Sequence, residues 1–100
     1  MTPPRHDPNP MHNPAPAYPS ISRRLKEEGI VELLVLILPD GSVGEIKIKV
    51  SSGYPRLDKT AVAAVKRWTY LPAKRGDTPI AFWYLQPLEF SLNSWNRGAG

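Results

Sequence analysis

A tight turn between two runs of strand-forming residues limits the possible folds of this chain more than any other feature. Residues 30–38 are mostly β-branched or aliphatic, and Pro39, Asp40 and Gly41 follow them. Proline presets φ and glycine accepts a positive φ, so this tripeptide favours a turn. Residues 43–50 then alternate apolar and charged side chains, which is typical of an antiparallel strand with one solvated face. The segment is therefore predicted to be a β-hairpin.

Two helices are predicted on either side of this hairpin. Ser20 can cap a short helix over residues 21–28, and Gly29 is expected to end it in a left-handed conformation. A loop at 51–55 precedes the second helix. We expect Trp68 to be a core residue of that helix rather than a ligand-stacking one. The apolar residues that recur at helical spacing are Leu57, Ala61, Ala64, Val65 and Trp68.

A long final strand is predicted over residues 80–92, after a polar loop at 74–79. Pro87 cannot donate to a β-ladder, so this strand is expected either to form an edge or to be bulged there. The predicted fold is a small α+β two-layer domain in the order helix, hairpin, helix, strand. Two helices lie on one face of an antiparallel three-stranded sheet.

The chain is predicted to have three parts. Residues 1–17 are rich in proline and are expected to form a flexible, polyproline-type tether. Residues 18–92 form the domain, and residues 93–100 are expected to be a mobile tail. The apolar run 33–38 is far shorter than the roughly eighteen residues that span a bilayer, so no membrane insertion of this fragment is predicted.

The sequence contains no recognisable catalytic or metal-binding constellation. It has no cysteine, and His6 and His12 both lie in the proline-rich segment, where nothing orients them. Asp40 and Asp58 each have a local structural role, and no glycine-rich loop follows a strand in a phosphate-binding arrangement. No enzyme activity, metal or cofactor is therefore predicted.

The final strand and one sheet face are the features that suggest binding. An edge strand presents unpaired backbone groups, which Pro87 and Glu89 can protect or an extended peptide can complete by β-augmentation. The residues alone leave these two alternatives open. If the helices cover one face only, the other carries an apolar patch. This outer-face patch consists of Leu34, Leu36, Leu38, Trp83 and Leu85.

An ordered series of residues resembles the C-terminal domain of the TonB family. The similarity covers residues 14–92, and its strength lies in the order of the landmarks rather than in any one of them. These landmarks are Tyr18-Pro19, Gly29, Val31, Pro39-Asp40-Gly41, Val43, Ser51 to Asp58, Ala61 to Val65, Trp68, Tyr70, Pro72, Ala73, Gly76, Pro87 and Phe90.

The resemblance implies a periplasmic domain of an inner-membrane-anchored energy transducer. TonB-like proteins have a membrane anchor that works with the proton-driven ExbB–ExbD motor, and a proline-rich span across the periplasm. Their terminal domain catches the TonB-box peptide of outer-membrane transporters as an added strand, which drives uptake of cargo such as iron siderophores. Some members have Gln-Pro where this chain has Ala15-Pro16. On this likeness the partner-binding residues are Leu85, Gln86, Pro87, Leu88, Glu89, Phe90, Ser91, Leu92, Ala15, Pro16 and Tyr18.

Other functions remain open at this stage. The same fold could serve as a TolA-like envelope-linking domain or as a module appended to a sensor. An open edge could also pair with a second copy to give a homodimer. The net charge of +4 and pI near 9.6 allow a small nucleic-acid-binding module. The basic residues are not gathered in a stripe, so no nucleic-acid partner is predicted.

Overall fold

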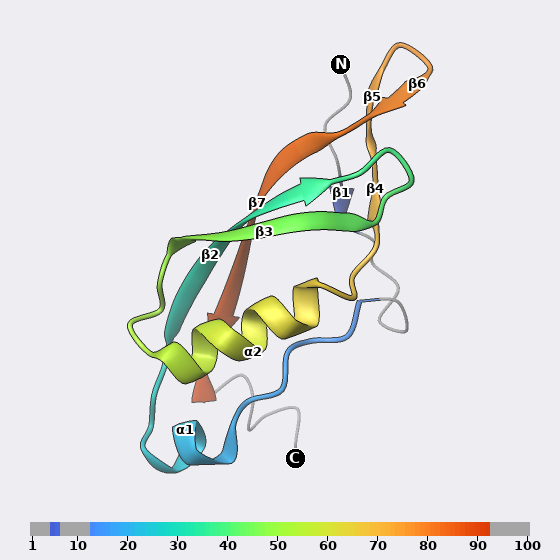
Figure 1. Ribbon diagram of the computed structural model, residues 1–100. Helices are drawn as coiled ribbons and strands as arrows, with labels where there is room; N and C mark the ends of the chain where they lie inside the picture. The colour runs from blue at the N-terminus through green and yellow to red at the C-terminus, as the bar shows by residue number, and fades with distance from the viewer. Residues whose placement is uncertain (1–4, 7–12, 93–100) are drawn as a thin grey trace.

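The computed structural model describes residues 5–6 and 13–92. Its main body is an antiparallel three-stranded sheet in the order β3-β2-β7, with one helix across a face and a second at the end where β2 begins (Figure 1). This arrangement confirms the predicted α+β fold and its order of helix, hairpin, helix and strand. The elements are α1 (Ser20–Arg24), β2 (Gly29–Ile37), β3 (Val43–Val50), α2 (Pro55–Val65) and β7 (Phe82–Phe90).

Among the described residues, four short strands lie outside this sheet. The predicted polar loop at 74–79 is in fact a hairpin, because Gly76 takes a φ of 63° and turns the chain back on itself. The final strand consequently starts at Phe82, two residues later than predicted. The short strands are β1 (Arg5–His6), paired with β4 (Tyr70–Leu71), and β5 (Ala73–Arg75), paired with β6 (Thr78–Ile80).

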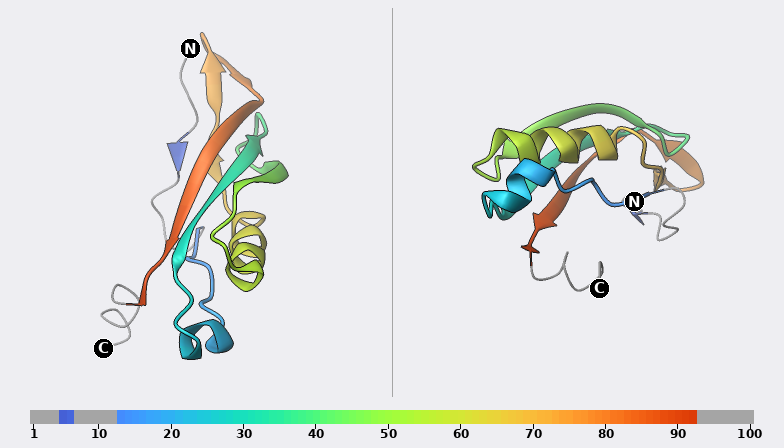
Figure 2. Two further views of the ribbon diagram at one scale, coloured as in Figure 1. Left: turned by 90° about the vertical axis from the view of Figure 1, so that its left-hand side faces the viewer. Right: turned by 90° about the horizontal axis from the view of Figure 1, so that it is seen from below.

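The core lies between the sheet and α2, which covers one face of the sheet (Figure 2). The central strand alternates strictly: Val31, Leu33, Val35 and Ile37 are fully buried, and the residues between them are half-buried. From α2 come the buried side chains of Leu57, Ala61 and Val65, and Trp68 follows the helix with 5% exposure. The prediction that Trp68 is a core residue is confirmed, but the helix to which it was assigned ends at Val65, three residues before it.

The first helix is shorter than predicted and ends differently. Pro19 occupies the cap position, and the helix has no side-chain cap from Ser20. The left-handed residue is Lys26, with a φ of 58°, so the prediction for Gly29 was wrong. Gly29 is instead the first residue of β2, where a Cβ would lie 2.7 Å from the Ser52 carbonyl oxygen. Close backbone approach explains this glycine.

The hairpin between β2 and β3 turns where the sequence predicts. Gly41 takes a φ of 86°, and its N–H donates to the Leu38 carbonyl at 2.8 Å. The Gly41 carbonyl accepts from the Tyr70 N–H, also at 2.8 Å. A Cβ at this position would lie 2.2 Å from the Tyr70 carbonyl oxygen. The turn is thus bound tightly to Tyr70, the first residue of β4.

Candidate functional site

The outer side of β7 is the feature of this fold that can accept another chain. β7 pairs with β2 at nine successive positions, from Phe82↔Ile37 to Phe90↔Gly29, without a register shift. The bulge allowed by the sequence is therefore absent, and Pro87 lies in an edge strand. Across residues 5–6 and 13–92, no strand pairs with the other side of β7. Its outward-facing backbone groups form an edge that a partner strand can complete.

Pro87 fixes which backbone groups face outward. It is opposite Glu32, and a proline fits a regular ladder only where its nitrogen points away from the neighbouring strand. Backbone groups alternate sides along a strand, so Leu85 and Glu89 also direct their N–H and C=O groups away from β2. The N–H groups of Leu88 and Phe90 face β2 instead. Leu85 and Glu89 are therefore the donors of the open edge around Pro87.

Gln86 occupies part of this edge. Its side-chain Nε2 donates to the Pro87 carbonyl at 2.9 Å, and its Oε1 accepts from the Tyr70 hydroxyl at 3.0 Å. Burial, and to a lesser extent Tyr84, raises the pKa of Tyr70 well above its usual value, so the hydroxyl keeps its proton. Gln86 is itself buried. The outward-facing Pro87 carbonyl therefore already accepts a hydrogen bond from the Gln86 side-chain amide.

The even-numbered site residues of β7 serve the core. Leu88 and Phe90 are buried, whereas Leu85, Pro87 and Glu89 are exposed. Phe90 meets Tyr18 edge-to-face with ring centroids 5.4 Å apart.

Tyr18 lies within the fold rather than on a free binding surface. Its ring is buried, and its hydroxyl donates to the Glu27 carbonyl. Burial comes first among the causes that raise the pKa of Tyr18, followed by the nearby carboxylates Glu28 and Glu27. Tyr18 precedes α1 and contacts Phe90 at the end of β7.

The end of the predicted site is tied to the loop after α1. The Leu92 N–H donates to the Glu28 carboxylate at 2.8 Å, and both Ser91 and Leu92 are half-buried. Sequence reasoning missed Glu28 because its partner is distant in the chain. This bond satisfies the last donor of the segment, so the open edge ends before Leu92.

The proline-rich leader is bonded to α2 and the segment after it. Asn13 and Thr69 exchange two hydrogen bonds, of 2.8 and 2.7 Å, and Trp68 Nε1 donates to the Pro14 carbonyl at 2.8 Å. Thr60 Oγ1 donates to the Ala17 carbonyl at 2.8 Å. The boundary at residue 17 stays a prediction, but residues 13–17 already contact the domain. Only the tryptophan and the polar residues near it could have signalled this in the sequence.

Ala15 and Pro16 lie beside α2. They line a groove against α2, together with Pro14, Ala17, Thr60, Ala63, Ala64 and Arg67. The position of Ala15 and Pro16 is therefore set by their packing beside α2.

The outer-face patch is partly open to solvent. Trp83 and Leu85 are 41% and 39% exposed, and they pair directly with Leu36 and Leu34, which are half-buried. Lys47 of β3 lies over the Trp83 ring at 5.1 Å from its centroid. The patch adjoins the open edge of β7, so a strand added there would bring its own side chains beside Trp83 and Leu85.

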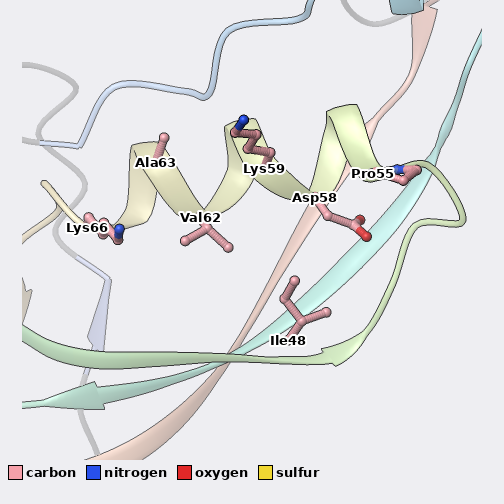
Figure 3. A pocket seen from close by; sticks show the side chains of 7 residues that line it. All are labelled: Ile48, Pro55, Asp58, Lys59, Val62, Ala63 and Lys66. Carbon is pink, nitrogen blue, oxygen red and sulfur yellow. The ribbon is translucent and has the colours of Figure 1, made fainter.

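A second concave surface lies between α2 and β3, with a volume of about 520 Å³. Figure 3 shows Asp58 and Val62 pointing from α2 towards Ile48 of β3. Asp58 accepts from the Ser51 hydroxyl, from the Ser52 hydroxyl at 2.7 Å and from the Ser52 N–H at 2.9 Å. Burial raises the pKa of Asp58, but these bonds outweigh it and leave the pKa below its usual value. This carboxylate is committed to the loop and is poorly suited to act as a base.

The described residues contain neither a candidate metal site nor a candidate membrane-spanning helix. They contain no group of three His, Cys, Asp or Glu side chains that could hold a metal ion. No helix formed by residues 5–6 and 13–92 has the length and apolarity to cross a membrane.

Comparison with known proteins identifies the family to which this chain is similar. Residues 14–92 match the family described as Gram-negative bacterial TonB protein C-terminal. Protein tonB2 of Pseudomonas aeruginosa is 49% identical over 83 residues, which are 83% of this chain and 31% of that protein. Protein TonB of Neisseria gonorrhoeae is 38% identical over 82 residues, 80% of this chain and 26% of that protein. The chain thus spans less than a third of either relative.

A solved structure shares the fold. The solution NMR structure of the Pseudomonas aeruginosa TonB C-terminal domain superposes with a TM-score of 0.68. It covers 80% of this chain and 81% of that chain, at 24% sequence identity. At this identity the likeness speaks for the fold alone.

Proposed function

The chain belongs to the family of TonB protein C-terminal domains, and on that premise we propose that it captures an extended peptide of an outer-membrane transporter as an added strand on β7. The observation that carries this proposal is the unshifted ladder of β7 with β2, beside an outer side that no strand pairs with in residues 5–6 and 13–92. The peptide is the TonB box of the transporter, and the contact is a β-augmentation.

Backbone hydrogen bonds of β7 supply most of the binding affinity in this proposal. Leu85 and Glu89 offer both an N–H donor and a carbonyl acceptor on the same side, whereas the Pro87 carbonyl already accepts from the Gln86 amide. Each ladder bond contributes only about 1 kcal/mol net, so the complex is weak and reversible. When force acts along the strands, several bonds must break together, so the same weak site can resist a pull and then release.

Side chains beside the edge supply selectivity. On the outer face, Trp83 and Leu85 are exposed and adjoin the position of an added strand. Pockets beside alternate residues give a β-augmented complex its specificity, whereas the backbone bonds accept any sequence. We therefore expect the captured peptide to carry apolar side chains on the face that meets Trp83 and Leu85.

The rest of the mechanism belongs to parts of a longer protein. The relatives are more than three times the length of the matched region. We propose that an inner-membrane anchor coupled to ExbB–ExbD pulls on this periplasmic domain through a proline-rich span, with the energy of the proton gradient. Cargo uptake, siderophore-bound iron included, follows from the transporter that is engaged. Family membership favours this function over the TolA-like, sensor-appended and nucleic-acid-binding alternatives.

Chemical-shift mapping tests the proposal. The ¹⁵N-labelled chain is titrated with TonB-box peptides from transporters of the same genome. We expect shift changes along residues 82–90 of β7 and smaller ones along its neighbour β2. Light scattering at two concentrations separates peptide capture from pairing of two copies. Shift changes confined to β3, or none at millimolar peptide, would contradict the proposal.

A further inference from the structure

The opposite side of the domain, where α2 meets β3, has an uncovered part of the helix layer. Ile48 points to the same face of the sheet as the core residue Leu33, its partner in β2, yet it is 49% exposed. α2 therefore leaves the outer strand of the sheet partly uncovered. Val62 and Pro55 of α2 form the other apolar wall of this groove (Figure 3). A second helix beside α2 would complete the layer.

The charge of the groove is positive. Lys59 and Lys66 line it, and neither has an ion-pair partner among the described residues. Asp58 is the one acidic residue in the lining, and its carboxylate is occupied by Ser51 and Ser52. The groove therefore offers two free ammonium groups around an apolar centre.

We propose that this groove binds an acidic amphipathic helix of a partner protein. Lys59 and Lys66 are seven residues apart, which is about 10 Å along a helix axis. A partner helix running alongside α2 places carboxylates seven residues apart at the same spacing. Apolar residues midway between them then meet Ile48 and Val62. The site is separate from the open edge of β7, so its failure would leave the strand-capture proposal standing.

A designed probe tests the groove. It is an alanine-based helical peptide with two glutamates seven residues apart and two leucines midway between them. We expect it to shift the amide signals of Ile48, Val62 and their neighbours and to leave those of β7 unchanged. Its helix content should rise on binding, which circular dichroism measures. A matched peptide with lysines in place of the glutamates should not bind.

Two charge-reversal variants provide the control. Lys59→Glu with Lys66→Glu should weaken probe binding about tenfold, because two attractions become repulsions. Lys74→Glu with Arg75→Glu makes the same change in net charge on β5, outside the groove lining, and should weaken binding less than about twofold. All four side chains are exposed, so the fold should survive. Equal weakening by both variants, shifts on β7, no shifts, or equal binding of the lysine peptide would overturn the proposal.

Discussion

The two outer strands of the sheet differ in how they meet their neighbour. β7 keeps one register with β2 over its whole length, whereas the pairing of β3 with β2 shifts between Glu32 and Leu33 and again between Leu36 and Ile37. Such irregularities bend a strand and disturb any further ladder. β3 also carries Glu45 and Lys47, joined by an ion pair of 3.7 Å. Bulges and charged side chains are the usual protection of an edge strand.

The difference shows that the receptivity of an edge depends on anchoring as well as on exposure. On β7 the even-numbered side chains are half-buried or buried, and this anchors the strand in one register while its outer side remains open. On β3 most side chains are exposed, and the pairing of this strand with β2 is interrupted by two register shifts. We therefore propose that the edge of β7 binds a peptide strand through its backbone. The groove between α2 and β3 binds a partner helix through side chains.

The largest expected contrast is in stability. Phe90→Ala removes a ring that is 3% exposed and packed on Tyr18, so it should lower the free energy of unfolding by about 3–5 kcal/mol. Ile48→Ala, at a half-exposed position of β3, should cost less than about 1.5 kcal/mol. Urea unfolding measures both. Similar losses would show that the two strands are anchored alike.

A smaller effect is expected from the amide on the open edge. Gln86→Leu leaves the Tyr70 hydroxyl without this acceptor and should cost about 1–3 kcal/mol. Tyr70→Phe removes both the hydroxyl and its need for a partner, so the double variant should recover part of the loss. A double-mutant cycle from urea unfolding gives the coupling. Additive losses would mean that Tyr70 does not hold Gln86.

The loop that follows β3 should respond to acid. Asp58 has a pKa below its usual value in the folded chain, so its contribution is present at neutral pH and is lost as the pH falls from about 4 through the lowered pKa. Asp58→Asn should lower stability at pH 7 by about 1–2 kcal/mol and flatten this acid limb. Unfolding midpoints between pH 7 and pH 2 measure it. An unchanged acid limb would assign that limb to other carboxyl groups.

The smallest expected loss of stability concerns the contact between Lys47 of β3 and Trp83 on the outer face. Lys47→Ala removes the cation over Trp83 and should cost about 0.5 kcal/mol at this exposed site. Trp83 fluorescence should shift with it, whereas Lys49→Ala serves as the control on the same strand. A larger loss for Lys49 would contradict the assigned contact.

Patterns local in sequence predicted the fold well. The hairpin, α2 and the even-numbered core face of β7 follow from turn residues and from periods of two and of about four residues, and all are present. The landmarks from Tyr18 to Phe90 gave the family. Pro87 indicated either an edge strand or a bulge, because the absence of an N–H is a property of one residue, and the structure shows the edge strand.

Contacts between distant residues could not be predicted in the same way. The role of Gly29 depends on Ser52, and the order of residues 13–17 depends on bonds to Thr60, Trp68 and Thr69. The link from Tyr70 through Gln86 to Pro87 requires the sheet to be assembled first. A sequence shows which groups can bond, but only the fold shows which of them meet.

The most direct test of strand capture compares two substitutions at one outward-facing position. Glu89→Pro deletes a donor from the open edge without disturbing β2, as Pro87 already does, whereas Glu89→Ala keeps the N–H. Isothermal titration with a TonB-box peptide should show binding about tenfold weaker for Glu89→Pro and nearly unchanged for Glu89→Ala. Circular dichroism should confirm that both variants fold. Equal affinities of the two variants would contradict capture of the peptide by the backbone of β7.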